Sequence, residues 1–345
     1  MESGNLRGEE RHNYGIALLR MLMCFEVILS HFWAEGRTRH VPPLNELLGV
    51  HVPVFMFLSF YLTEKTFLEK SPEKAWKRLR RLAVPHVAWA FVYWAAQEAA
   101  LRAFGVNMGG GIRARAWQLG TGCSGSLNAA MWFQTNLIAL TALFFLMFRL
   151  LPAEKGMALA YGMTLAALAA QYSGLNLRLF GSLRFELKYP LGRFCEMVPY
   201  ATLGFFCARH AVFERARIVH AASILLFGAA GLLLTRYTVV APAAGFGYSY
   251  NNAIPLAFSL VAFAALLPLE RLPRTIKRVM RFASRYTLGI YCMHMLIGKT
   301  LRVLLPKLGI GMGGIRSCAL IYAVGFAVSL ALSRISARRL GQLVD

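Results

Sequence analysis

Acidic residues are scarce in this chain. Its 345 residues include 16 Asp and Glu against 38 Lys and Arg, and charged residues of both signs make up only 16% of the sequence. Hydrophobic residues make up 57%, a balance far from that of a soluble domain. Because the basic residues lie between apolar runs, membrane topology and anionic lipid explain the net charge of +22, and nucleic-acid binding is not indicated.

Cysteine motifs are also missing. The six cysteines show no C-x-x-C spacing, and most lie inside apolar runs, where a thiol behaves as a small hydrophobic group. The sequence therefore predicts neither a disulfide framework nor a metal site.

Long apolar runs recur along the whole chain. Twenty residues of helix span roughly 30 Å, which matches the hydrocarbon core of a bilayer. The runs are 15–34, 44–62, 82–101, 129–151, 156–172, 191–208, 218–234, 251–269, 287–305 and 315–335. They predict an all-α, polytopic membrane helix bundle of about ten transmembrane helices.

The basic residues between the runs predict the orientation of the bundle. One side carries 23 Lys and Arg and the other 13, and the richer side is expected to be cytoplasmic. Much of the bias comes from two segments, 65–81 and 271–285, which we interpret as loops lying on the anionic lipids of the inner leaflet. Both termini are then cytoplasmic, and the protein is expected in the inner or plasma membrane.

This orientation divides the chain into three parts. We predict a cytoplasmic N-terminal segment at 1–14, one membrane domain at 15–335 and a cytoplasmic tail at 336–345. Between 102 and 128 the chain has seven glycines, which predicts a long outer loop or a partly re-entrant segment.

The first run carries ionisable residues at membrane depth, and some of them share one helix face. Arg20 and His31 lie eleven positions apart, which at about 100° per residue brings them within roughly 20° of each other. About 16 Å of depth separates them. Glu35 follows His31 by four residues on the same face, where a carboxylate would fix the imidazole tautomer. Glu26 points about 140° away from His31.

Two interpretations of this face stay open. Lipid penalises charged side chains, so Arg20 and His31 are candidates for a reaction path across the membrane. Alternatively, Arg20 snorkels to the interface and His31 bonds to a carbonyl group in the core.

Two later pairs of residues are three positions apart and therefore share a helix face. Arg193 and Glu196 would pair within the bundle, as a structural ion pair or as part of a site. Tyr291 and His294 form the second pair, and His294 alone is typical of a core histidine.

Several separated pieces of the sequence resemble one known family. The first is the arginine and the histidine of LLRMLMCFEVILSHFW, and the second is VPVFMFLSFYL followed by KRLRRLAVP. MWF, CEMVPYATLGFFCAR and SRYTLGIYCMHM follow in order. Together the pieces resemble the membrane acyltransferase 3 family, which includes bacterial O-acetyltransferases of surface glycans. The resemblance covers 15–335.

The resemblance implies acyl transfer from cytoplasmic acyl-CoA to a hydroxyl group of a surface or lipid-linked glycan. The donor is expected to be acetyl-CoA, because the resembling enzymes mostly use it, and no metal is implied. His31 is the expected general base and Glu35 orients it, while Arg20, Arg78 and Arg81 bind the donor phosphates. The expected substrate residues are Trp132, Arg193, Glu196, Tyr291 and His294.

A transporter is the alternative class. Polytopic bundles with buried Arg, Glu and His side chains also build ion and proton paths, as in a proton-coupled exporter. An inverted repeat with paired broken helices would favour that class, and the sequence shows none.

Overall fold

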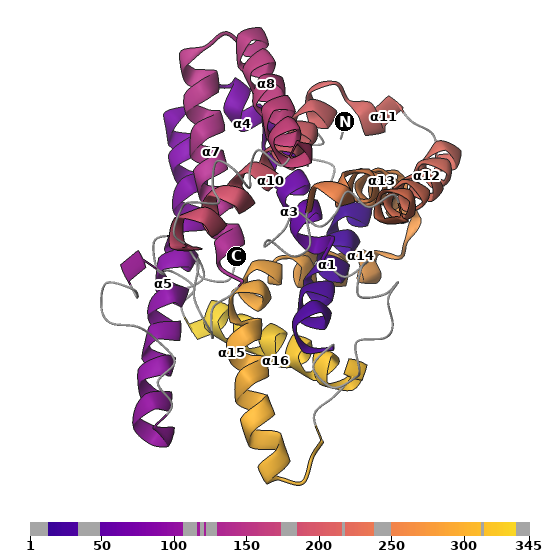
Figure 1. The fold of residues 1–345 in the computed structure, drawn as a ribbon. Coiled ribbons are helices and arrows are strands. Elements are labelled where there is room, and N and C mark those ends of the chain that lie inside the picture. The colour runs from indigo at the N-terminus through magenta and orange to yellow at the C-terminus, as the bar shows by residue number, and fades with distance from the viewer. Residues whose placement is uncertain are drawn as a thin grey trace, which may run out of the picture.

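The part of the chain that the structure describes is built from helices, without a strand (Figure 1). The structure is a computed structural model that describes residues 13–33, 49–105, 116–117, 121, 130–173, 185–215, 218–237, 250–311 and 314–335. Its α-helices are α1 (Tyr14–Phe32), α3 (His51–Tyr61), α4 (Glu64–Leu68), α5 (Pro72–Phe104), α7 (Trp132–Leu150), α8 (Ala153–Tyr172), α10 (Phe185–Arg209), α11 (Val212–Arg215), α12 (Ile218–Tyr237), α13 (Ile254–Leu266), α14 (Arg274–Ser284), α15 (Thr287–Lys307) and α16 (Gly314–Ile335). Two 3-10 helices are η2 (Tyr250–Ala253) and η3 (Leu269–Arg271).

Among the residues that the structure describes, five helical segments are long and apolar enough to cross a membrane, so the chain is a multi-pass membrane protein. They are Tyr14–Phe32, Trp132–Leu150, Ile254–Arg271, Thr287–Lys307 and Gly314–Arg334. Each of the ten predicted runs overlaps a helix of the described residues, which confirms the all-α fold. The helices at the other five runs are not among these spans. For example, α3 has only 11 described residues, and α5 and α10 carry charged residues.

The two basic segments are helical, so their interpretation as loops was wrong. The first contains most of α4 and the opening turns of α5, and the second contains the last residue of η3 and all of α14. Lys and Arg are good helix formers, and a charged helix lacks the apolar run by which we recognised the others. The start of α5 carries a clear signal: Ser71 caps Lys74, and Pro72 occupies the first turn. The helix ends at Gly105, whose φ of 66° is the left-handed conformation that glycine favours.

α1 lies at the centre of the fold and packs against α3, α13, α14, α15 and α16 (Figure 1). Asn13 caps its first turn by accepting from the Ile16 amide at 3.0 Å, and its side-chain amide donates to the Ala265 carbonyl at 2.9 Å. At Gly15 a Cβ atom would lie 1.8 Å from the Ala264 carbonyl oxygen. The glycine therefore lets α1 and α13 approach closely, and the side chains of α1 have fixed neighbours.

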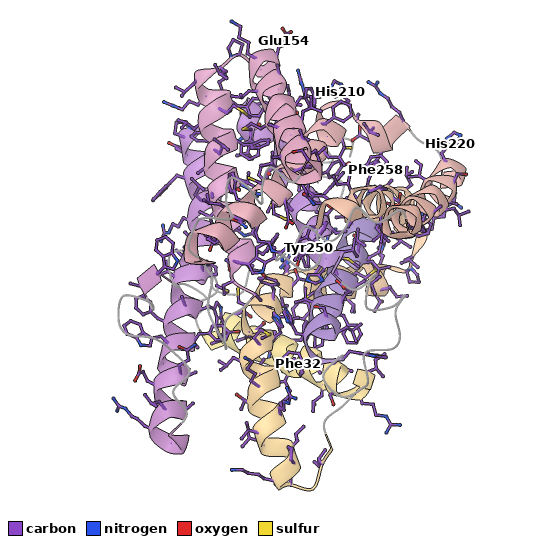
Figure 2. All side chains as sticks on the ribbon, viewed as in Figure 1. Phe32, Glu154, His210, His220, Tyr250 and Phe258 are labelled. Carbon is purple, nitrogen blue, oxygen red and sulfur yellow. The ribbon has the colours of Figure 1, made fainter. Side chains whose placement is uncertain are left out.

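Aromatic side chains fill the interior beside α3. Phe148 stacks on Phe205 with ring centroids 4.6 Å apart, and Phe60 meets Phe144 edge to face at 4.7 Å. Figure 2 shows the side chains on the whole fold. The histidines His210 and His220 are exposed at its periphery, so they are not candidates for a buried site.

Candidate active site

Arg20 and His31 are half-buried on α1 and line two different cavities. We call them the arginine cavity, of about 320 Å³, and the histidine cavity, of about 250 Å³. Tyr291 lines both of them. The shared helix face predicted from the sequence thus joins two neighbouring spaces, and Tyr291 stands between them.

The arginine cavity collects the three arginines that the sequence assigned to a donor. Its lining residues are Arg20, Phe55, Leu58, Ser59, Leu62, Thr63, Arg78, Arg81, Leu82, Phe133, Leu137, Thr287, Leu288 and Tyr291. No Asp or Glu lines the cavity among the residues that the structure describes. Three cations around an otherwise largely apolar space fit an anionic ligand that also has an apolar part.

Two of these arginines are held by hydroxyl and carbonyl oxygens. Arg20 donates to the Thr287 hydroxyl at 3.1 Å, and that hydroxyl donates in turn to the Ser284 carbonyl at 3.1 Å. Arg78 donates to the Ser59 carbonyl at 3.0 Å and to its hydroxyl at 2.8 Å. These neutral oxygens orient the guanidinium groups without neutralising their charge.

The charge of Arg78 persists at neutral pH. Desolvation and, to a smaller extent, the nearby charge of Arg81 together lower the pKa of the Arg78 guanidinium to about 10. Its Nε lies buried without a hydrogen-bond partner among the described residues. A buried donor of this kind is costly unless it is satisfied, and an anion in the cavity would satisfy it.

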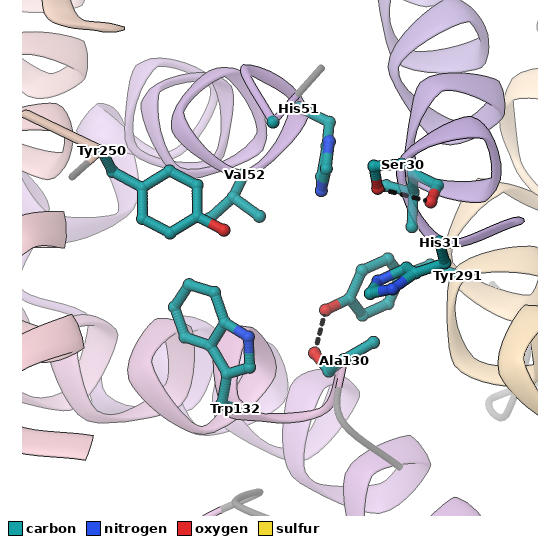
Figure 3. Close-up of a pocket in the computed structure, with 10 residues that line it drawn as sticks. Ser30, His31, His51, Val52, Ala130, Trp132, Tyr250 and Tyr291 are labelled. Atoms are coloured by element: carbon teal, nitrogen blue, oxygen red, sulfur yellow. Dashed lines mark hydrogen bonds between the residues drawn. The ribbon is translucent and has the colours of Figure 1, made fainter. Parts of the chain in front are cut away.

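The histidine cavity has aromatic and imidazole walls (Figure 3). Its lining residues are Val27, Ser30, His31, Gly49, His51, Val52, Ala130, Trp132, Tyr250 and Tyr291. No Lys or Arg lines it among the residues that the structure describes. A neutral, hydrogen-bonding molecule with flat apolar faces fits such walls better than an anion does.

Tyr291 has a fixed place between the cavities. Its hydroxyl donates to the Ala130 carbonyl, as Figure 3 shows. Its ring meets Phe133 and Phe55 edge to face, with centroids 5.7 and 6.4 Å away. Because hydrogen bond and ring packing both restrain it, the wall shared by the two cavities is well defined.

Arg193 and Glu196 form the predicted pair behind the histidine cavity rather than inside it. The Arg193 Nη1 lies 2.7 Å from the Glu196 Oε2, and both residues are buried. The guanidinium lies 4.8 Å from the Tyr250 ring centroid and 5.5 Å from that of Trp132. The pair therefore supports two aromatic walls of the cavity from behind.

His294 lies beneath the cavity and does not line it. It is fully buried, its Nδ1 is hydrogen-bonded to the Tyr291 carbonyl, and its ring centroid is 5.4 Å from that of His31. This agrees with a core histidine. Its Nε2 has no hydrogen-bond partner among the described residues. The other predicted residue, Glu35, lies outside the described residues, as does most of the glycine-rich segment 102–128.

The sequence did not single out His51 or a role for Glu26. Glu26 lies on α1 away from the His31 face, as predicted, but its carboxylate reaches the start of α3 and binds His51. His51 lies inside an apolar run that we predicted only as a membrane helix. Gly49, two residues before it, was the one local signal of a turn at the start of this helix. The cavity thus has two imidazole walls where the sequence indicated one.

Comparison with known proteins gives one match. A family model described as an acyltransferase domain (Acyl_transf_3) matches residues 13–335. No curated protein and no solved structure matches the chain.

Proposed function

The chain belongs to the acyltransferase 3 family, and on this premise we propose that it moves an acyl group from acyl-CoA to a hydroxyl group of a surface or lipid-linked glycan. The observation that carries this proposal is the pair of cavities that share Tyr291. One of them is cationic and the other is lined by imidazoles, so donor and acceptor would enter different spaces and meet at one wall.

The arginine cavity is the proposed donor site. Arg78 and Arg20 would bind phosphate oxygens of the donor through their guanidinium forks, and Arg81 would add charge at the more exposed rim. The apolar lining suits the chain that leads from the phosphates to the thioester. We propose acetyl-CoA as the donor, with its thioester at Tyr291.

The histidine cavity is the proposed acceptor site. A sugar ring presents apolar faces to aromatic side chains and hydroxyl groups to polar ones, and Trp132 and Tyr250 would be those aromatic walls. Arg193 and Glu196 would keep the two rings in place.

The chemical step needs a base. The acceptor oxygen bonds to the thioester carbonyl carbon, the carbon–sulfur bond breaks, and the hydroxyl proton must leave. We propose that His31 takes this proton and returns it to the departing thiolate, because it lines the acceptor cavity on the helix that carries Arg20. Glu35 is the proposed orienting carboxylate.

The proposed topology is ten membrane crossings with both termini in the cytoplasm. Arg78 precedes the apolar part of α5, so the arginine cavity would then open toward the cytoplasmic pool of acyl-CoA. Reporter fusions after Arg81 and Arg285 are expected to report the inside. Fusions at 109–111 are expected to report the outside.

Radiolabelled acetyl-CoA tests the function directly. Membranes that contain the protein are expected to release CoA and to incorporate label that mild alkali removes as acetate, whereas matched membranes without it do neither. Label that resists alkali would indicate amide rather than ester formation. If the membranes show no CoA release and no incorporated label, acyl transfer is contradicted and the transporter class is favoured.

A further inference from the structure

The carboxylate of Glu26 holds the start of α3 through three hydrogen bonds. Its Oε1 accepts from the Gly49 amide at 2.5 Å, and its Oε2 accepts from the His51 amide at 3.1 Å. The His51 Nδ1 is also bonded to Oε2. One carboxylate of α1 therefore fixes both the backbone and the ring of His51.

These contacts determine which nitrogen of His51 faces the cavity. An ionised carboxylate only accepts hydrogen bonds, so the Nδ1 must be the donor. In the neutral imidazole, Nε2 is then the acceptor. His51 is 5% exposed, and the far end of its ring, which carries Nε2, points into the histidine cavity (Figure 3).

His51 and His31 line the same cavity from different helices. One imidazole is enough to deprotonate an attacking hydroxyl group. In its neutral form the second imidazole presents the lone pair of Nε2 to a space whose other walls include Trp132 and Tyr250. A molecule that lies in this space and reaches His31 would meet His51 with another of its polar groups.

We propose that His51, held by Glu26, binds the acceptor through a second hydrogen-bond donor, separate from the hydroxyl group that is acylated. This inference rests on the proposed function. It assigns the acceptor to polyhydroxyl compounds, because a simple alcohol has no second group to donate to His51. In this reaction His51 is a specificity-determining residue, and the transferred proton does not pass through it.

A pair of substitutions at His51 separates this role from a structural one. In His51→Asn the amide nitrogen takes the place of Nδ1, so the contact with Glu26 is kept while the acceptor at Nε2 is lost. In His51→Gln the amide oxygen reaches the place of Nε2, so the cavity keeps an acceptor while the contact with Glu26 is weakened. The proposal predicts that His51→Asn is the more damaging substitution.

The measurement is the rate at which alkali-labile label from acetyl-CoA is incorporated into the acceptor, at varied amounts of acceptor. The acceptor probe is a heat-treated membrane preparation from a host that lacks this protein. His51→Asn is expected to raise the apparent KM for this preparation about tenfold, with the KM for acetyl-CoA unchanged. His51→Gln is expected to stay within about threefold of wild type. His86→Asn, a buried histidine of α5 that lines neither cavity, is the matched control.

Three results would overturn the proposal. If His51→Asn matches wild type while His51→Gln fails, the histidine only supports Glu26. If His51→Asn lowers kcat with an unchanged KM for the acceptor preparation, His51 takes part in proton transfer instead. If the molecule that wild type acylates has no hydrogen-bond donor besides the acylated hydroxyl group, the acceptor class is wrong. Absence of labelled ester in wild type would instead refute the proposed function itself.

Discussion

The arginine cavity and the histidine cavity differ in the way their polar groups are satisfied. In the first, Arg20 and Arg78 donate to neutral oxygens of Thr287 and Ser59, which leaves their charge available. In the second, the carboxylate of Glu26 accepts three hydrogen bonds behind the wall and keeps its charge out of the cavity. One space therefore presents guanidinium groups, and the other presents imidazole rings.

This difference teaches how a membrane protein can hold two unlike substrates close together. Guanidinium groups bind phosphate, but a guanidinium close to an imidazole lowers the pKa of the ring and so weakens it as a general base. Tyr291 keeps the two environments apart with a neutral side chain. Substitutions on each side should then affect one substrate and spare the other, and four predictions test this separation.

The largest effect is expected at His31. His31→Ala should lower the turnover number about 10²- to 10⁴-fold, because a general base typically contributes that much to the rate. Acetyl-CoA binding should be unchanged, because His31 does not line the arginine cavity. The rate of ester formation and the affinity for acetyl-CoA are measured on the same purified protein.

Protein abundance is the control for His31→Ala. Loss of a structural histidine would first reduce the amount of folded protein in the membrane. Normal abundance with a normal rate of ester formation would refute the catalytic role of His31. A weakened affinity for acetyl-CoA would show that the two cavities are not separate.

Arg78→Ala is expected to raise the apparent KM for acetyl-CoA about 10- to 100-fold, which corresponds to the loss of hydrogen bonds to a charged group. The KM for the acceptor should not change. Arg80→Ala is the matched control, since Arg80 lies two residues away on α5, is exposed and lines neither cavity. Equal effects of the two substitutions would mean that Arg78 acts only through the general positive charge of this surface and does not bind the donor directly.

Much of the fold could be predicted from the sequence because apolar runs mark membrane helices wherever they occur. The run 129–151 coincides with α7 to within three residues at each end. The interpretation of the basic segments was wrong for a related reason, because an amphipathic helix such as α14 has a clear helical period but no continuous apolar run. Ser71 and Pro72 would have indicated the start of α5 if capping had been weighed against hydropathy.

The site could be predicted where one helix determines it. The spacing of Arg20 and His31 fixes their common face through helical periodicity alone. The contact of Glu26 with His51 could not be predicted in this way, because it depends on how the N-terminus of α3 packs against α1. No periodicity within either helix contains that information.

Arg20→Lys is expected to raise the apparent KM for acetyl-CoA about three- to tenfold. Lysine keeps the positive charge but loses the fork and its fixed direction toward Thr287. Turnover at saturating acetyl-CoA should be close to that of wild type, and the two constants come from one titration. Arg149→Lys, at an exposed position near the end of α7, controls for the exchange itself. Unchanged donor affinity with a reduced turnover would move Arg20 from donor binding to the chemical step.

The smallest effect is expected at the shared wall. Tyr291→Phe removes the hydrogen bond to the Ala130 carbonyl but keeps the ring between Phe55 and Phe133. Loss of one neutral hydrogen bond should raise the KM for acetyl-CoA and for the acceptor about two- to threefold each, because the wall borders both cavities. Tyr93→Phe is the matched control, since the Tyr93 hydroxyl donates to the Cys292 carbonyl at 2.8 Å and lines neither cavity. A Tyr291→Phe protein with only one altered KM would mean that the tyrosine belongs to a single site, and the two substrates would then have to meet at another wall.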